Sequence, residues 1–217
     1  MTKEPYLTAA TIDRDASGIL ADIAPYTRNR AAAYDPAHAA LLVLDMQKYF
    51  LDPASHAFAP AAPVIVPGVL SLIAAFERTG RPVICTRHLD GPDPSSPMLR
   101  WWRGRVVESD PASTLIDGIA SSQPVLHKHA YDAFQGTTLE ATLRSLKITQ
   151  VVVVGVLTHL CVESTARAAF MRGFDVMMPV EGSATYTRDL HVGALRGLAH
   201  GFANMTRIAD IRDAHTA

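Results

Sequence analysis

The chain has 217 residues with a formal net charge of −1, and 48% of its residues are hydrophobic. This composition fits one large α/β domain with a sizeable core, and the small net charge argues against nucleic acid or an anionic membrane surface as the main partner. Two cysteines cannot build a disulfide framework, the polar start lacks the apolar core of a signal peptide, and no window approaches the about 20 apolar residues of a membrane span. We therefore expect a soluble cytoplasmic protein.

Residues 1–37 are polar and irregular, and we interpret them as an N-terminal arm before a domain at 38–217. Along that domain, short apolar runs alternate with segments of helical spacing. The runs predict strands buried on both faces, at 39–46, 81–88, 123–129, 150–156, 175–181 and 205–210. The spacing predicts helices at 67–80, 113–122, 137–148, 162–173 and 188–201, the third with a capping box of Thr137 and Glu140. This alternation is typical of a three-layer α/β/α fold with a doubly wound, mainly parallel sheet of about six strands.

The segment from Asp90 to Pro111 is longer than an ordinary connection and holds four of the 14 prolines and both tryptophans. We interpret it as an ordered functional loop or lid. Its tryptophans and nearby arginines would suit a planar or carboxylate-bearing substrate. The same side chains could instead pack the loop onto the domain or form an oligomer contact. These residues are Trp101, Trp102, Arg87, Arg100, Arg103 and Arg105.

Three reactive side chains follow the carboxyl ends of predicted strands, where open parallel sheets bind their ligands. Asp45 ends the first strand, Lys128 lies in the third, and Cys161 follows the fourth. A thiolate is the nucleophilic form of cysteine, and a helix start and a neighbouring lysine both favour it. Asp45 could take the thiol proton and return it to a leaving amine, and backbone N–H groups of the turn before Cys161 could hold an oxyanion. The pattern predicts acyl transfer to a cysteine, followed by hydrolysis.

Each of these residues also has a purely structural interpretation. A cysteine after a buried strand is often core filler, and an aspartate at a strand end is often a turn or cap residue. A lone lysine there is usually solvated. Only the convergence of all three favours catalysis.

Three stretches resemble the isochorismatase-like cysteine hydrolases, a superfamily of nicotinamidases, N-carbamoylsarcosine amidases, ureidoacrylate-type amidohydrolases and isochorismatases. They are LLVLDMQKYF, HKHAYDAFQGTTLEATL and VVVVGVLTHLCVESTARAAFMRGFDVMMPVEGSAT, and the resemblance covers residues 38–210. It implies a catalytic triad of Asp45, Lys128 and Cys161 and a six-stranded parallel sheet. It also implies a cis peptide between Val156 and Leu157 and an oxyanion hole made by the N–H groups of Leu157 and Cys161.

Within the superfamily that this chain resembles, the residue at position 161 separates members that catalyse different reactions. Isochorismatases of siderophore and phenazine pathways resemble this chain near both of its ends. In that pattern glycine stands in place of Cys161 and alanine in place of Thr158, and these enzymes cleave a vinyl ether without a thiol. The cysteine favours hydrolysis of a C–N bond in a small amide, ureide or carbamoyl substrate. Vinyl ether cleavage of the isochorismate type is the alternative, and a binding or scaffold protein with a vestigial site is a third hypothesis.

The resemblance to nicotinamidases implies a possible metal site. The residues of this chain that come nearest to the ligands of that site are Asp52, His56 and His88. Three such ligands could in principle bind zinc. The spacing of Asp52 and His56 departs from the family pattern, and the D-W-H-P element is missing. We therefore expect no metal and no other cofactor.

Position relative to the triad suggests further substrate contacts. We expect a small-molecule substrate, a structural or pocket-wall role for His159, and a homo-oligomer, either a dimer or a tetramer. The candidate substrate-binding residues are Gln47, Phe50, Arg87, Trp101, Tyr131, Phe134 and Thr158.

Overall fold

The apolar runs form the strands of one parallel sheet in the computed structural model, which describes residues 2–28, 32–102, 104–119 and 125–215. The order across the sheet is β3-β2-β1-β4-β5-β7, and the short β6 pairs with the last residues of β4. The strands are β1 (Ala39–Leu44), β2 (Val83–His88), β3 (Leu126–Lys128), β4 (Gln150–Val156), β5 (Asp175–Pro179), β6 (Ser183–Ala184) and β7 (Asn204–Thr206). The predicted six-stranded parallel sheet is confirmed, with β6 as a seventh, two-residue strand.

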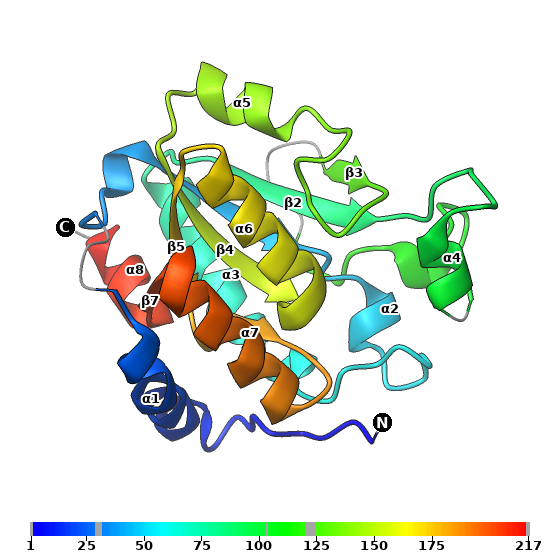
Figure 1. The fold of residues 1–217 in the computed structure, drawn as a ribbon, viewed down its shortest axis with the longest axis horizontal. Helices are drawn as coiled ribbons and strands as arrows, with labels where there is room; N and C mark the ends of the chain where they lie inside the picture. Colours follow the sequence, from blue (N-terminus) through cyan, green and yellow to red (C-terminus); the bar gives the residue numbers. More distant parts are fainter. Residues whose placement is uncertain (1, 29–31, 103, 120–124, 216–217) are drawn as a thin grey trace.

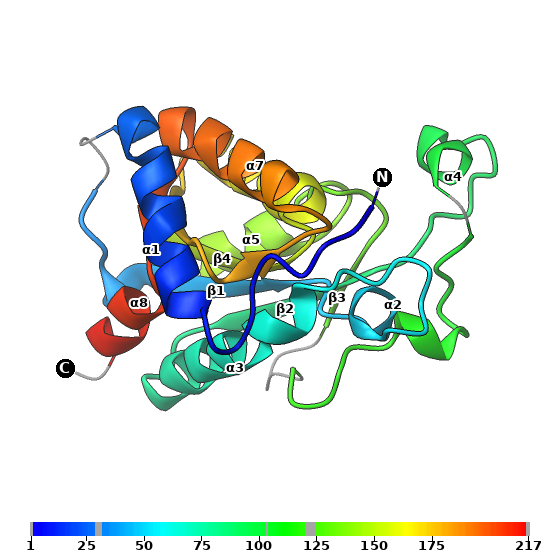
Figure 2. The ribbon, with the colours of Figure 1, turned by 90° about the horizontal axis from the view of Figure 1, so that it is seen from below.

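Helices cover both faces of this sheet. α1, α6 and α7 lie over one face, and α3 and α8 lie over the other (Figures 1 and 2). Every residue of β1 and β4 is buried, which explains why these two strands read as unbroken apolar runs. The helices are α1 (Ile12–Ile23), α2 (Lys48–Leu51), α3 (Ala62–Arg78), α4 (Pro97–Trp101), α5 (Leu139–Ser145), α6 (Glu163–Met171), α7 (Arg188–Gly201) and α8 (Ile208–Ala214).

Two predicted helices differ from the structure. Helix α3 begins at Ala62, five residues before the predicted start, so Pro67 lies inside it. The described part of the predicted helix at 113–122 contains only the end of a 3-10 turn, Pro111–Ser113. The segment after that turn is extended, because Thr114 and Ile116 exchange backbone hydrogen bonds with the chain after β1. Pairing with a distant segment has thus overridden the local spacing.

The predicted capping box at Thr137 does not form. Helix α5 begins at Leu139, and the Thr137 hydroxyl donates to the Ala133 carbonyl at 2.6 Å. The Glu140 carboxylate pairs with Arg172 at 3.2 Å instead of turning back to the helix start. The predicted strand at 205–210 also divides, since β7 ends at Thr206 and α8 begins at Ile208.

The N-terminal arm packs along the domain. Helix α1 lies against α7, and the segment before it runs to the end of the molecule where α2 lies (Figures 1 and 2). The Glu4 N–H donates to the Tyr186 carbonyl at 2.9 Å, and the Tyr6 hydroxyl accepts from the Thr185 N–H at 3.0 Å. Among the described residues, no helix has the length and apolar character needed to cross a membrane.

Candidate active site

The register of the parallel strands brings three sequence-distant side chains to one edge of the sheet. Leu44 at the end of β1 pairs with Gly155 of β4, and His88 at the end of β2 pairs with Lys128 of β3. Asp45 and the turn carrying Cys161 therefore emerge beside each other. The Lys128 ammonium reaches both of them.

The Lys128 ammonium forms an ion pair with Asp45 and donates hydrogen bonds to the Ala130 carbonyl and the Cys161 sulfur. Its Nζ lies 2.7 Å from Asp45 Oδ2, 2.9 Å from the Ala130 carbonyl oxygen and 3.2 Å from Cys161 Sγ. Both Asp45 and Lys128 are fully buried, and Cys161 is 5% exposed. Lys128 is thus held in one orientation between the carboxylate and the thiol.

Asp45 is fixed from its other side by β2. The Thr86 hydroxyl donates to Asp45 Oδ1 at 2.6 Å and accepts from the Asp45 N–H at 3.2 Å. The backbone of Asp45 has a φ of +52°, in the left-handed region that non-glycine residues rarely adopt. The carboxylate is therefore positioned by a sharp backbone turn as well as by its partners.

The protonation states of the three groups differ from the sequence prediction, which favoured a thiolate at Cys161. Burial raises the pKa of the Cys161 thiol, and the Asp45 charge raises it further, against the opposing effect of Lys128. For Asp45 burial acts to raise the pKa, but the charges of Lys128 and His88 outweigh it and the net shift is downward. For Lys128 burial acts to lower the pKa, but Asp45 and Cys161 make the net shift upward. The resting site thus holds a carboxylate, an ammonium and a neutral thiol.

Cys161 lies in a π-helical turn, Thr158–Val162, that leads directly into α6. The peptide bond between Val156 and Leu157, just before this turn, is cis. Gly155 has a φ of +116°, and a Cβ at this position would lie 2.1 Å from the Leu44 carbonyl oxygen. Only glycine allows β4 to approach β1 this closely.

A buried chain of hydrogen bonds lies beneath the cysteine turn. His191 Nε2 lies 3.0 Å from the Val180 carbonyl oxygen, which can only accept, so this nitrogen carries the proton. Burial lowers the pKa of His191 to about 4, so the ring is neutral and its Nδ1 accepts from the Thr158 hydroxyl at 2.9 Å. Thr158 Oγ1 also lies 3.1 Å from the Ser183 hydroxyl oxygen, which extends the chain to β6.

A cavity of about 300 Å³ opens onto the triad at Cys161. Its wall is rich in aromatic rings, and its charged groups come from Lys3 and Asp90. The lining residues are Lys3, Tyr49, Phe50, His56, Ala57, His88, Asp90, Met98, Trp101, Trp102, Gly104, Val106, Tyr131, Leu157, Leu160, Cys161 and Tyr186.

Three of the seven predicted substrate contacts lie on this wall, namely Phe50, Trp101 and Tyr131. The Tyr131 hydroxyl accepts a hydrogen bond from the Trp102 indole, which ties the long loop to the segment after Lys128. The loop itself folds into the short helix α4. Arg103, in the same loop, lies outside the described residues.

The other four predicted contacts are structural. Gln47 is fully buried and bonds the backbone of His88 and of Ser113. Arg87 donates to the Ser113 and Glu108 carbonyls, and Phe134 stacks on Phe174 with ring centres 6.0 Å apart. Thr158 is also fully buried. None of these four side chains lines the cavity, because each packs or forms hydrogen bonds behind its wall.

The candidate metal ligands do not converge. Asp52 accepts from the Ala54 N–H within its own turn, and His56 Nε2 lies 3.1 Å from the Tyr49 hydroxyl. His88 Nε2 lies 3.6 Å from Asp90 Oδ1. Within the described ranges, no three His, Cys, Asp or Glu side chains are grouped as a metal site would require. The residues present therefore do not fit a bound metal ion.

Several residues of the cavity wall were not predicted from the sequence. Lys3 and Tyr186 come from segments with no motif, and they reach the cavity only because the arm packs beside the turn before α7. His159 bonds the Thr185 hydroxyl at 2.6 Å and is absent from the cavity wall. Tyr49 lies beside the predicted contact Phe50 on α2, and this pair of aromatic residues could have pointed to Tyr49 as a wall residue.

Comparisons with known proteins identify the family. A family model described as the isochorismatase domain matches residues 39–210. Nicotinamidase 3 of Arabidopsis thaliana is 33% identical over 180 residues, which cover 80% of this chain and 87% of the relative.

Solved structures show the same fold. A cysteine hydrolase from Pseudomonas syringae pv. phaseolicola has a TM-score of 0.81 at 24% identity and covers 87% of this chain and 98% of its own. N-carbamoylsarcosine amidase from Thermoplasma acidophilum has a TM-score of 0.67 at 30% identity, covering 78% of this chain and 96% of its own. The chain therefore belongs to the isochorismatase family of hydrolases.

Proposed function

We propose that the protein is a cysteine amidohydrolase that cleaves a C–N bond of a small amide, ureide or carbamoyl substrate. The observation that carries this proposal is the buried bridge from Asp45 through Lys128 to Cys161, of which Cys161 lines the cavity. A thiol, a base and a fixed cation are the groups that acyl transfer to cysteine needs. Burying the Asp45–Lys128 ion pair costs desolvation free energy, and a functional role beside the thiol would account for that cost.

The first chemical step follows from the resting charges. Asp45 takes the proton of Cys161 as Sγ attacks the substrate carbonyl carbon, so the developing negative charge moves to the carbonyl oxygen. The backbone N–H groups of Leu157 and Cys161 receive that oxygen, and the Lys128 cation stabilises the thiolate as it forms. Protonated Asp45 then donates its proton to the leaving nitrogen as the C–N bond breaks, leaving a thioester.

The second step restores the site. Asp45, again a carboxylate, takes a proton from a water molecule, and the resulting hydroxide attacks the thioester carbonyl. The C–S bond breaks, Cys161 regains its proton, and the carboxylic or carbamic acid leaves. One water is consumed for each C–N bond cleaved.

The shape of the cavity supports a small planar substrate. Its volume of about 300 Å³ is at the lower end for small-molecule sites, and tyrosine, phenylalanine and tryptophan rings line it. Two of the similar proteins, a nicotinamidase and an N-carbamoylsarcosine amidase, are by name enzymes that act on amide-type bonds.

A substrate screen tests the proposal by measuring ammonia and pyruvate release separately across amides, ureides and isochorismate. We expect ammonia release from at least one C–N substrate and a fall in kcat of at least about 10³-fold in Cys161→Ala, because the nucleophile is lost. Cys85→Ala is the matched control, since Cys85 lies in β2 and donates to the Ile119 carbonyl rather than entering the cavity. That variant should keep its activity.

The alternative reaction gives a different pattern. A vinyl ether hydrolase would release pyruvate from isochorismate, would tolerate Cys161→Ala and would be disabled by Asp45→Asn. Hydrolysis of amides that survives in Cys161→Ala would refute the cysteine mechanism.

A further inference from the structure

Lys3, from the N-terminal arm, enters the wall of the same cavity as Cys161. Its Nζ donates to the His56 carbonyl at 2.7 Å and to the Phe58 carbonyl at 2.8 Å. It also lies 4.3 Å from the centre of the Tyr186 ring, a cation–π contact. The ammonium is therefore held by two carbonyls and one ring, and one of its three N–H bonds is left for another acceptor.

No carboxylate of residues 2–28, 32–102, 104–119 or 125–215 forms an ion pair with Lys3. The other charged group on the wall, Asp90, is already engaged. It lies 3.6 Å from His88 and accepts from the Val106 N–H at 2.7 Å. Burial lowers the pKa of Lys3, as expected for a half-buried cation without a counter-ion. Among the described residues, Lys3 is thus a cation on the cavity wall without a carboxylate partner.

The arm is anchored independently of Lys3. Glu4 donates through its N–H to the Tyr186 carbonyl, and its carboxylate accepts from the Arg188 N–H at 2.6 Å. The Tyr6 hydroxyl accepts from Thr185, and Leu7 is buried in the core. These contacts fix the backbone on one side of the cavity, while Lys3 reaches across to the loop at residues 56–58. The ammonium is therefore placed by the fold and not by its own hydrogen bonds alone.

We propose that Lys3 is a specificity-determining residue whose ammonium binds a carboxylate on the substrate, at the end of the substrate away from the bond that is cleaved. The inference rests on the proposed function and narrows it to amides that carry an anionic group. The carboxylate would take the remaining N–H and supply the missing counter-charge, while the aromatic wall holds the body of the substrate. Charge-assisted hydrogen bonds of this kind are among the stronger polar contacts.

Matched pairs of aromatic amides test the inference. The probes are 3- and 4-carbamoylbenzoate, compared with 3- and 4-methylbenzamide, which replace the carboxylate by a methyl group. Binding is measured by calorimetry on Cys161→Ala, which keeps the cavity without turnover, and kcat and KM are measured on the active enzyme. Lys3→Met removes the charge, Lys3→Arg keeps it, and Lys48→Met is the control for the same change on an exposed lysine.

We expect a carbamoylbenzoate to bind at least about tenfold more tightly than its methyl counterpart. Lys3→Met should remove that preference by raising KM about tenfold with little change in kcat, because the contact is the same in the ground and transition states. Lys3→Arg should retain most of it, and Lys48→Met all of it.

Two kinds of result would overturn the inference. One is the absence of a binding preference, whether the members of each pair bind equally or neither binds. The other is a Lys3→Met effect of the same size on the charged and neutral amides, which would mean that Lys3 only anchors the arm. Failure of the proposed function would give a different result, because no amide would be hydrolysed. The tighter binding of carbamoylbenzoates to Cys161→Ala, measured by calorimetry, would still test the role of Lys3.

Discussion

At the scale of single residues, the candidate site holds its thiol in the protonated form. Lys128 lies between Asp45 and Cys161, but its shorter contact, at 2.7 Å, is with the carboxylate. The cation is thus mostly balanced by Asp45, and burial decides the state of the sulfur. A helix start and a nearby lysine predicted a lowered thiol pKa, but the pKa is raised, first because the sulfur is buried and second because the Asp45 carboxylate lies beside it.

The alkylation rate of Cys161 should therefore depend on pH up to and beyond the ordinary thiol value. Since the pKa of Cys161 is raised above its usual 9.0, the thiolate fraction grows about tenfold per pH unit throughout the range below that value. Iodoacetamide modification, located by peptide mass spectrometry, should show no plateau between about pH 6 and 9. The same cysteine in urea-unfolded protein is the control and should level off near its ordinary pKa. A rate in the folded protein that is independent of pH below 7 would contradict this.

At the scale of elements, the site depends on how closely β4 approaches β1. A methyl group on residue 155 would lie 2.1 Å from the Leu44 carbonyl oxygen, and the φ of +116° is unfavourable for any side chain. We expect Gly155→Ala to lower the free energy of unfolding by about 3 kcal/mol or more, because both overpacking and backbone strain oppose it. Urea denaturation followed by circular dichroism measures this change.

Gly193→Ala is the matched control for that substitution. Gly193 lies within α7, is exposed, and has open space where a Cβ would be placed. Alanine there should stabilise the protein by up to about 1 kcal/mol, since it favours the helix. If both alanine variants had the same stability as the wild type, the close approach at Gly155 would not matter to the fold.

The buried histidine of α7 makes stability depend on pH. Burial lowers the pKa of His191 to about 4, from 6.5 for the free side chain. Between these values the unfolded chain binds a proton that the folded protein does not, so this contribution is complete above pH 6.5 and is lost as the pH falls toward 4. For His191 alone, the free energy of unfolding should be about 2 kcal/mol lower at pH 5 than at pH 7.

Comparison with His191→Gln isolates the contribution of His191 to the pH dependence of stability. Glutamine does not titrate, so the variant should lose less stability than the wild type between pH 7 and pH 5 in urea denaturation. Other groups that titrate in this interval contribute equally to both proteins. An identical pH dependence in the two would show that His191 takes up no extra proton on unfolding.

At the scale of the whole molecule, the sequence is most informative where local pattern and tertiary structure agree. Continuous apolar runs predicted the central strands, and the fold class followed from their alternation with helices. Thr158 and Gln47 lie behind the cavity wall, and the sequence could not tell this because position after a strand does not fix which way a side chain points. Lys3 could not be found at all, since its place on the cavity wall comes from the docking of the arm beside Tyr186.

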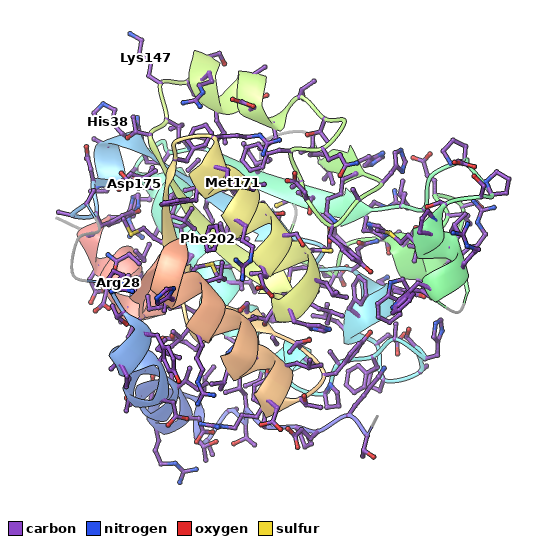
Figure 3. All side chains as sticks on the ribbon, in the orientation of Figure 1. Arg28, His38, Lys147, Met171, Asp175 and Phe202 are labelled. Atoms are coloured by element: carbon purple, nitrogen blue, oxygen red, sulfur yellow. The ribbon has the colours of Figure 1, made fainter. Side chains whose placement is uncertain are left out.

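One face of the molecule exposes apolar side chains at the end of α6. Met171 is 71% exposed and Phe170 is 47% exposed, and Phe170 packs edge-on against Phe202 at 5.5 Å. Figure 3 shows Met171 and Phe202 on the face formed by α6 and α7. An exposed apolar patch of this kind is typical of a protein contact, so this face is where we expect the predicted homo-oligomer to form.

The oligomer prediction is tested by sedimentation velocity over a range of concentrations. The wild type should sediment as a dimer or tetramer, and Met171→Glu should shift it toward the monomer, because a charge buried in an interface without a partner is unfavourable. Val107→Glu is the control, since Val107 is also exposed but lies in the loop between Asp90 and Pro111 rather than on α6. This variant should sediment like the wild type. A wild-type monomer at every concentration, or an equal effect of the two substitutions, would show that the α6 face is not where the chains meet.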